Sequence, residues 1–198
     1  YAAKVRQINM TRIDIDNIHQ LEFKNPEIPA LEIEQEIEIP PYSGDLESAT
    51  LQTLLAFNTS VDEIISKITP ENIQLLSGAD TKQLMRHPER IAVFEAIKNT
   101  GATPPDDFIR EAIAVSAFGN DTQTCEYLLN NFEMNAAILD VPSSNKDIGS
   151  TALICAVNKN NPYLVRLLIE KGANVNADAN KYDKNGETPA HLAGWAGY

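Results

Sequence analysis

Cysteine is scarce in this chain of 198 residues, which contains only Cys125 and Cys155. Both lie in apolar stretches with helical spacing, and this predicts two small buried side chains in a reducing compartment rather than a disulfide. Long hydrophobic runs are also missing, since no segment approaches the roughly 18 consecutive apolar residues that a membrane-spanning helix needs. The first residues, Tyr1 to Val5, lack the basic and apolar regions of a signal peptide. These absences predict a cytoplasmic protein with no membrane span.

Basic residues are few, because 16 Lys and Arg stand against 28 Asp and Glu and give a formal net charge of −12. Such a chain repels the phosphates of a nucleic acid, so we expect no nucleic-acid partner. The imbalance is strongest between Lys24 and Lys67, where no basic residue occurs. This acidic stretch is either a docking face for a basic partner or a solvated strand face whose charges block edge-to-edge aggregation.

Motifs for catalysis and metal binding are missing as well. His19, His87 and His191 lie in separate segments, and no pair has a metal-ligand spacing such as H-E-x-x-H or C-x-x-C. The chain has no nucleophile elbow, no phosphate-binding loop and no dinucleotide-binding turn. Cys125 acting as a nucleophile with a distant histidine is conceivable, but its apolar helical setting favours a core position. We therefore expect no metal, no cofactor, no small-molecule ligand and no catalytic residue.

The first 45 residues differ from the rest, because their apolar positions alternate. From Leu31 to Ile39, aliphatic residues fall on one face and glutamates on the other, which is typical of a half-buried strand. Weaker runs occur around residues 5–15 and 21–23, and prolines mark turns and the end of the segment. The pattern predicts a small β-rich N-terminal appendage over residues 1–45.

From Leu46 onward the apolar residues take a helical period, and short helices with recognisable ends follow one another. Ser60 with Glu63 has the pattern of a capping box, and Thr69 before Pro70 is typical of an N-cap with proline at the first helical position. Gly101 is expected to end a helix as its C-cap. The other helices are predicted at residues 91–97, 108–118, 125–132, 151–157, 163–169 and after Pro189. Helix pairs in series are expected, over residues 46–103 with a degenerate first repeat and over residues 104–198.

Internal repetition is the most informative feature. Residues 151–156 (TALICA) align with residues 188–193 (TPAHLA), and Leu167-Leu168 with the following loop aligns with Leu128-Leu129 and its loop. A fixed period of about 20–50 residues predicts a solenoid, in which stacked units share one core.

Residues 186–193 (GETPAHLA) resemble the ankyrin repeat with its T-P-L-H-x-A signature, and depart from it only at Ala190. Residues 163–177 resemble the second helix and exit loop of such a repeat. The resemblance is clear over residues 149–198, degenerate over 107–138 and weak over 80–103. It implies a mainly α fold, an ankyrin-type α-solenoid, to which the β-strand appendage is attached. It also implies structural roles for six motif residues: Thr151, Ala156, Thr188, Pro189, His191 and Ala193.

Two departures from the family pattern carry predictions. The repeat spacings exceed the usual length of about 33 residues, and the extra residues fall near 139–146 and 178–182, which predicts longer β-hairpin fingers there. The chain ends at Tyr198, just after the first helix of the last repeat, which suggests that the native protein continues beyond this residue.

The resemblance implies protein binding through hairpin tips and exposed positions of the inner helices. The residues at these positions are Asp147, Ile148, Ser150, Asn158, Lys159, Lys184, Asn185, Glu187 and Trp195. Trp195, the single tryptophan, is the strongest candidate because aromatic anchors dominate interface energies; alternatively, it packs against the rest of the repeat stack. Asn176 lies in a context that resembles ankyrin loops in which an asparagine is hydroxylated, although an unmodified asparagine that stabilises the loop would look the same.

Three functional hypotheses follow. The first is an adaptor or targeting module of a larger intracellular protein, with another protein as its partner. The second is the substrate-recruiting part of an enzyme whose catalytic domain lies outside this sequence, such as a bacterial effector acting in the host cytoplasm. The third makes residues 1–45 a strand-addition site that captures a peptide at an exposed edge.

Overall fold

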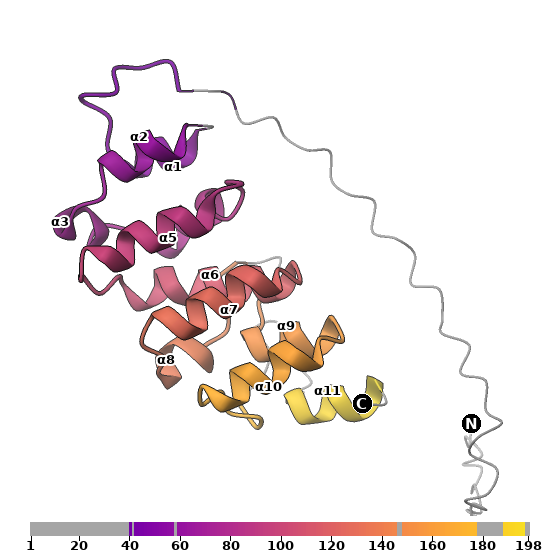
Figure 1. Ribbon diagram of the computed structural model, residues 1–198. Helices are drawn as coiled ribbons and strands as arrows, with labels where there is room; N and C mark the ends of the chain where they lie inside the picture. The colour runs from indigo at the N-terminus through magenta and orange to yellow at the C-terminus, as the bar shows by residue number, and fades with distance from the viewer. Residues whose placement is uncertain (1–39, 41, 58, 146–147, 178–187, 197–198) are drawn as a thin grey trace, which may run out of the picture. The chain divides into compact units, whose positions relative to one another are not determined.

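The computed structural model (Figure 1) describes residues 40, 42–57, 59–145, 148–177 and 188–196. All of them belong to one compact unit, residues Glu38–Tyr198. The predicted strands before residue 40 lie outside the described residues, and residues 42–50 form turns and a bend. The part of the chain that the structure describes is helical and contains no strand longer than a single bridge at Ser150.

The helices form two stacked rows. The inner row is α1 (Leu51–Ala56), α4 (Gly78–Leu84), α6 (Asp106–Phe118), α9 (Ala152–Asn158) and α11 (Pro189–Ala196), and each member contacts the next. The outer row is α2 (Val61–Ser66), α5 (Arg90–Asn99), α7 (Thr122–Asn131) and α10 (Pro162–Glu170), which stack in the same order. Two single-turn helices, α3 (Pro70–Ile73) and α8 (Ala136–Leu139), follow outer helices. The predicted α-solenoid is therefore confirmed, and its stacking begins at α1.

Side chains at the helix ends explain where the helices begin and stop. The capping box is present at Ser60, whose side chain accepts a hydrogen bond from the Glu63 amide, while the Glu63 side chain accepts one from the Ser60 amide. Thr69 caps α3, with Pro70 at its first position. Gly101 follows the end of α5 with a φ of +73°, a conformation in which glycine avoids the strain of a side chain. These local signals were all predictable from sequence.

One continuous hydrophobic core runs through both rows, from Ala49 to Ala173. On the inner helices it contains wholly buried alanines such as Ala112 and Ala156, whose small side chains allow close packing. On the outer helices it contains wholly buried leucines such as Leu128 and Leu168. The inner helices can therefore pack closely through small side chains, while the larger side chains of the outer helices fill the space between the two rows.

Both cysteines are free and buried, as predicted. Burial raises the pKa of the thiols of Cys125 and Cys155 to about 12, so almost no thiolate exists at neutral pH. We expect Ellman's reagent to react with both thiols at least about tenfold more slowly in the folded protein than in denaturant. A fast-reacting thiol in the folded state would contradict this placement.

No helix among the described residues is long and apolar enough to cross a membrane.

Candidate interaction surface

A buried carboxylate ties the loop before α9 to the inner row. Glu111 of α6 is 0% exposed, and its Oε1 accepts hydrogen bonds from the Ser144 amide at 2.6 Å and the Ser144 hydroxyl at 2.9 Å. Its other oxygen accepts a short hydrogen bond from the Ser143 hydroxyl. The Ser143 amide donates to the Ser150 carbonyl at 3.0 Å, which closes the loop at its base.

The structure describes the base of the finger that the sequence predicted near residues 139–146, while residue 146 lies outside the described residues. Within this segment Ser143 is 0% exposed, whereas Val141 is 42% exposed and Ser144 is exposed. The Glu111 carboxylate holds the base of the loop, because a buried polar group is costly unless donors surround it and the two serines supply them. The second predicted finger, at 178–182, lies outside the described residues.

The same carboxylate explains a glycine on the neighbouring helix. A Cβ at Gly78 would lie 2.7 Å from Cγ of Glu111, closer than real Cβ contacts come. The Gly78 amide also donates to Asp107 Oδ2 at 2.8 Å, and the Thr81 hydroxyl donates to the Phe108 carbonyl at 2.9 Å. Helices α4 and α6 and the loop before α9 are thus joined by buried and partly buried polar contacts.

The predicted contact residues fall into three groups. Asn158 and Lys159 are exposed at the C-terminal end of α9, and Ile148 is half-buried. Ser150 differs from the prediction, because it is only 6% exposed and its carbonyl is held by Ser143 at the base of the loop. Four of the predicted contact residues lie outside the described residues: Asp147, Lys184, Asn185 and Glu187. Trp195 lies in α11, but the structure describes only its backbone.

The structure adds one residue to this surface that the sequence analysis missed. Phe118, the last residue of α6, is 43% exposed, and Nζ of Lys159 lies 4.9 Å from the centroid of its ring. A cation at this distance is attracted to the ring face. Phe118 occupies the position in its helix pair that Asn158 occupies in the next, three residues before the N-cap of the following outer helix. That correspondence could have identified it.

The turns between inner and outer helices are joined across repeats. Asn161 caps α10 and donates from Nδ2 to Asn120 Oδ1 at 2.8 Å and to Thr122 Oγ1 at 2.9 Å. One repeat earlier, Arg90 donates to Asp121 Oδ2 from both Nη2 (2.5 Å) and Nε (3.0 Å). The cap residues therefore hold neighbouring outer helices in register.

Protonation of Asp121 should weaken this register. Burial acts to raise the pKa of the Asp121 carboxyl, but hydrogen bonds from Thr124 and Arg90 outweigh it and hold the pKa below its ordinary value of 3.8. The ionised group therefore contributes stability above about pH 4, which is lost as the pH falls through the folded pKa. We expect urea unfolding between about pH 5 and pH 2.5 to show a smaller loss of stability in Asp121→Asn than in the wild type. Parallel curves would contradict this role.

Thr188 and His191 contact each other at the start of α11. The Thr188 hydroxyl lies 2.9 Å from His191 Nδ1, and the His191 amide donates to the same hydroxyl at 3.3 Å. Thr151 has a similar place at α9, where its hydroxyl accepts from the Ile154 amide at 3.4 Å. Pro189 and Ala156 are buried, and Ala193 is half-buried. This geometry holds a loop to a helix start.

In the described part of the chain, no group of three His, Cys, Asp or Glu residues could hold a metal ion.

Comparison with known proteins gives a match to a family model described as "Ankyrin repeats (3 copies)", over residues 71–179 and residues 112–198. No curated protein and no solved structure matches the chain.

Proposed function

The chain belongs to the ankyrin-repeat family, whose fold is a non-catalytic protein-interaction module, and from this premise we propose that it acts as an adaptor or targeting region of a larger intracellular protein. The proposed surface is formed by the C-terminal ends of the inner helices and the loops that follow and precede them. Phe118, Lys159 and Asn158 form its described centre.

The exposed Phe118 ring beside Lys159 is the observation that carries this proposal. Helix α9 buries every residue from Ala152 to Val157, so it can offer a partner only its C-terminal end. At that end a large apolar side chain and a cation stand together in solvent. Aromatic and cationic groups that are desolvated together are the usual centres of binding energy in interfaces.

Four further predicted contact residues belong to the loops that precede α9 and α11 or to α11 itself. Asp147 and Ile148 belong to the loop whose base Glu111 fixes. Glu187 precedes α11 in the sequence, and Trp195 lies within α11. We include them in the proposal because the resemblance to ankyrin repeats places them at hairpin tips and inner-helix positions. Lys184 and Asn185 share that assignment.

The test is quantitative binding of the partner that the chain captures from a lysate. We expect Phe118→Ala to weaken binding by about tenfold or more, and Lys159→Ala by a smaller factor. Glu95→Ala, at an exposed position of outer helix α5, is the matched control and should bind like the wild type. Circular dichroism checks that each variant is folded. If Phe118→Ala binds as well as the control, the proposed surface is wrong.

A modification of Asn176 is proposed separately, on the resemblance of its loop to hydroxylated ankyrin loops. Asn176 is exposed after α10, and its amide donates to Asn174 Oδ1 at 2.9 Å. An enzyme could therefore reach its side chain. Intact-mass analysis of protein from its native cell should show the added mass of one oxygen atom, which Asn176→Ala should lack. Unmodified wild-type protein would remove the proposal.

A further inference from the structure

A cleft of about 240 Å³ lies between the loops that follow outer helices α5 and α7. Residues within 101–106 line one side of it, and residues within 131–138, up to the single-turn helix α8, line the other. Asp106 lines the cleft at the first position of α6, whereas Phe118 ends the same helix about 18 Å further along its axis. The cleft is therefore separate from the proposed surface at Phe118 and Lys159.

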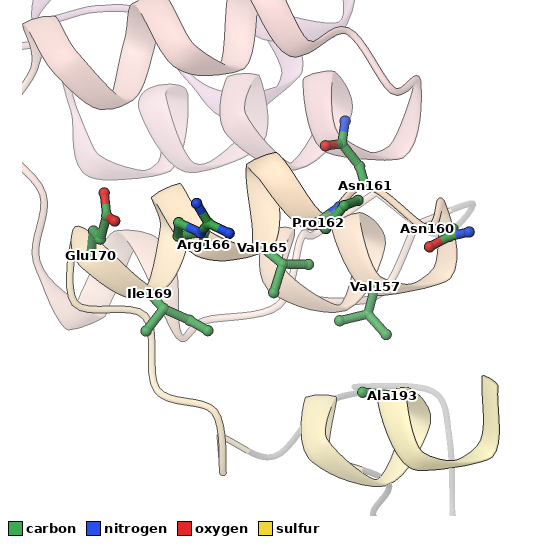
Figure 2. A pocket seen from close by; sticks show the side chains of 9 residues that line it. All are labelled: Val157, Asn160, Asn161, Pro162, Val165, Arg166, Ile169, Glu170 and Ala193. Atoms are coloured by element: carbon green, nitrogen blue, oxygen red, sulfur yellow. The ribbon is translucent and has the colours of Figure 1, made fainter. Parts of the chain in front are cut away.

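A larger groove of about 440 Å³ beside α10 has a different explanation. Figure 2 shows Val157, Val165 and Ile169 pointing from α9 and α10 toward α11. This side of α10 corresponds to the side of α7 on which α10 stacks, so the groove belongs to the stacking of the repeats. The cleft after α5 and α7 lies between repeats that are already stacked on each other, so repeat packing does not fill it.

The inner part of the cleft is apolar. Pro104, Ile109 and Ile138 are buried among its lining residues, and Phe132 is half-buried beside them. The Phe132 ring is held from behind by Phe94, since the two ring centroids lie 6.3 Å apart in an edge-on arrangement. A ligand of this cleft must therefore bring an apolar stem or a flat face for the inner part, together with polar groups for the rim.

The rim of the cleft carries two carboxylates and one cation. Asp106 and Glu133 are exposed, and within the part of the chain that the structure describes neither side chain forms a hydrogen bond or an ion pair. The N-terminal position of Asp106 in the 13-residue helix α6 favours its negative charge. The cation, Lys98, already donates to Asn131 Oδ1 at 2.5 Å. The rim therefore suits a positively charged group better than an acid.

Among cationic side chains, arginine fits this lining better than lysine. Its planar guanidinium stacks on aromatic rings such as Phe132, and its five N–H donors can serve more than one acceptor. Its methylene stem can cover the apolar lining while the charge stays at the rim. The net charge of −12 also favours the approach of a basic segment of another protein.

We propose that this cleft binds an arginine side chain of a partner protein, with the guanidinium at the Phe132 ring and its N–H groups donating to Asp106 and Glu133. The inference rests on the proposed protein-binding function, because a partner supplies the arginine, and it adds a chemical requirement at a second point of contact. Lys98 repels the bound cation, so this lysine lowers the affinity.

The probe is acetyl-arginine amide, added to the isotopically labelled chain at constant ionic strength while NMR follows the backbone amides. Saturable shifts are expected at residues 98–109 and 131–138. Acetyl-citrulline amide has nearly the same shape without the charge, and it should bind about fivefold more weakly, as expected for the loss of two exposed ion pairs. The α-acetyl amide of lysine should also bind more weakly than the arginine probe, because it cannot stack on the ring.

Variants that remove charge locate the binding. The double variant Asp106→Asn, Glu133→Gln should weaken arginine binding by about fivefold. The matched double variant Asp62→Asn, Glu95→Gln removes two exposed carboxylates outside the cleft and should bind like the wild type. Lys98→Met, which keeps the stem and removes the cation, should strengthen binding. All five positions are exposed, so each variant should melt close to the wild type.

Four results would overturn the proposal: no saturable shifts at the cleft, equal binding of arginine and either matched ligand, equal losses in the two double variants, or weaker binding by Lys98→Met. The last result would mean that the cleft binds an acid. Phe118→Ala should leave arginine binding unchanged, because Phe118 lies at the other end of α6. Failure at the cleft and failure of the proposed surface at Phe118 are therefore read independently.

Discussion

Phe94→Ala is expected to lower the free energy of unfolding by about 3–5 kcal/mol. Phe94 is 0% exposed in α5, and its ring centroid lies 5.9 Å from that of Phe108 and 6.3 Å from that of Phe132. These three rings belong to α5, to α6 and to the C-terminal end of α7. Truncation removes the apolar contact of the central ring and leaves a cavity between two repeats.

Urea denaturation followed by circular dichroism measures this loss, and Phe118→Ala is the matched control. The same atoms are removed from a ring that is 43% exposed, so the control should cost about 1 kcal/mol or less. Similar losses for the two variants would mean that the ring cluster is not a centre of packing between repeats. Because neighbouring repeats stabilise each other, we also expect the unfolding transition of Phe94→Ala to become broader if the solenoid separates into two parts.

Helix ends were predictable because their signals are local. Ser60 with Glu63, Thr69 with Pro70 and Gly101 each act through residues only a few positions away, so a single stretch of sequence contains the whole interaction. The repeat motif at residues 188–193 was informative for the same reason.

The elements that the sequence analysis missed depend on contacts from elsewhere. Helix α4 has the sequence GADTKQL, which offers no apolar period, and it is held by packing on α6 and by the cap at Ser77 and Asp80. The helices α1 and α2 were predicted, but they carry no repeat motif, so their stacking on α4 and α5 was not. Phe118 was predicted only as the last residue of the helix at 108–118, and its 43% exposure depends on where α6 ends.

The loop before α9 shows the same limit at the candidate site. Extra residues in a hairpin loop predict a projecting finger, but nothing local in the segment indicates what holds its base. The group that holds the base of the loop is Glu111, on a helix far earlier in the chain, and the sequence around it does not identify Ser143 and Ser144 as its partners. Long-range polar pairs of this kind have no periodic signature, so only the fold reveals them.

Replacing Glu111 should have the second-largest effect. Glu111→Leu leaves the buried Ser143 hydroxyl and the partly buried Ser144 donors without this acceptor, and Arg110, whose Nε lies 3.8 Å from Glu111 Oε1, without its counter-charge. We expect a loss of about 3 kcal/mol in the free energy of unfolding. Glu111→Gln keeps the shape and one acceptor oxygen, so it should lose about half as much.

Hydrogen exchange separates a tether from a simple core contact. The Ser144 amide donates directly to Glu111, so Glu111→Leu should accelerate its exchange by more than the change in global stability explains, while amides within α5 should follow global stability alone. Glu133→Gln, at an exposed position after α7, is the control for removing a carboxylate and should change neither quantity. Uniform acceleration throughout the chain would show that Glu111 only fills space. Selective acceleration at residues 143–145 would mean that this carboxylate sets the position of the loop that leads to Ile148, although Glu111 itself is 0% exposed.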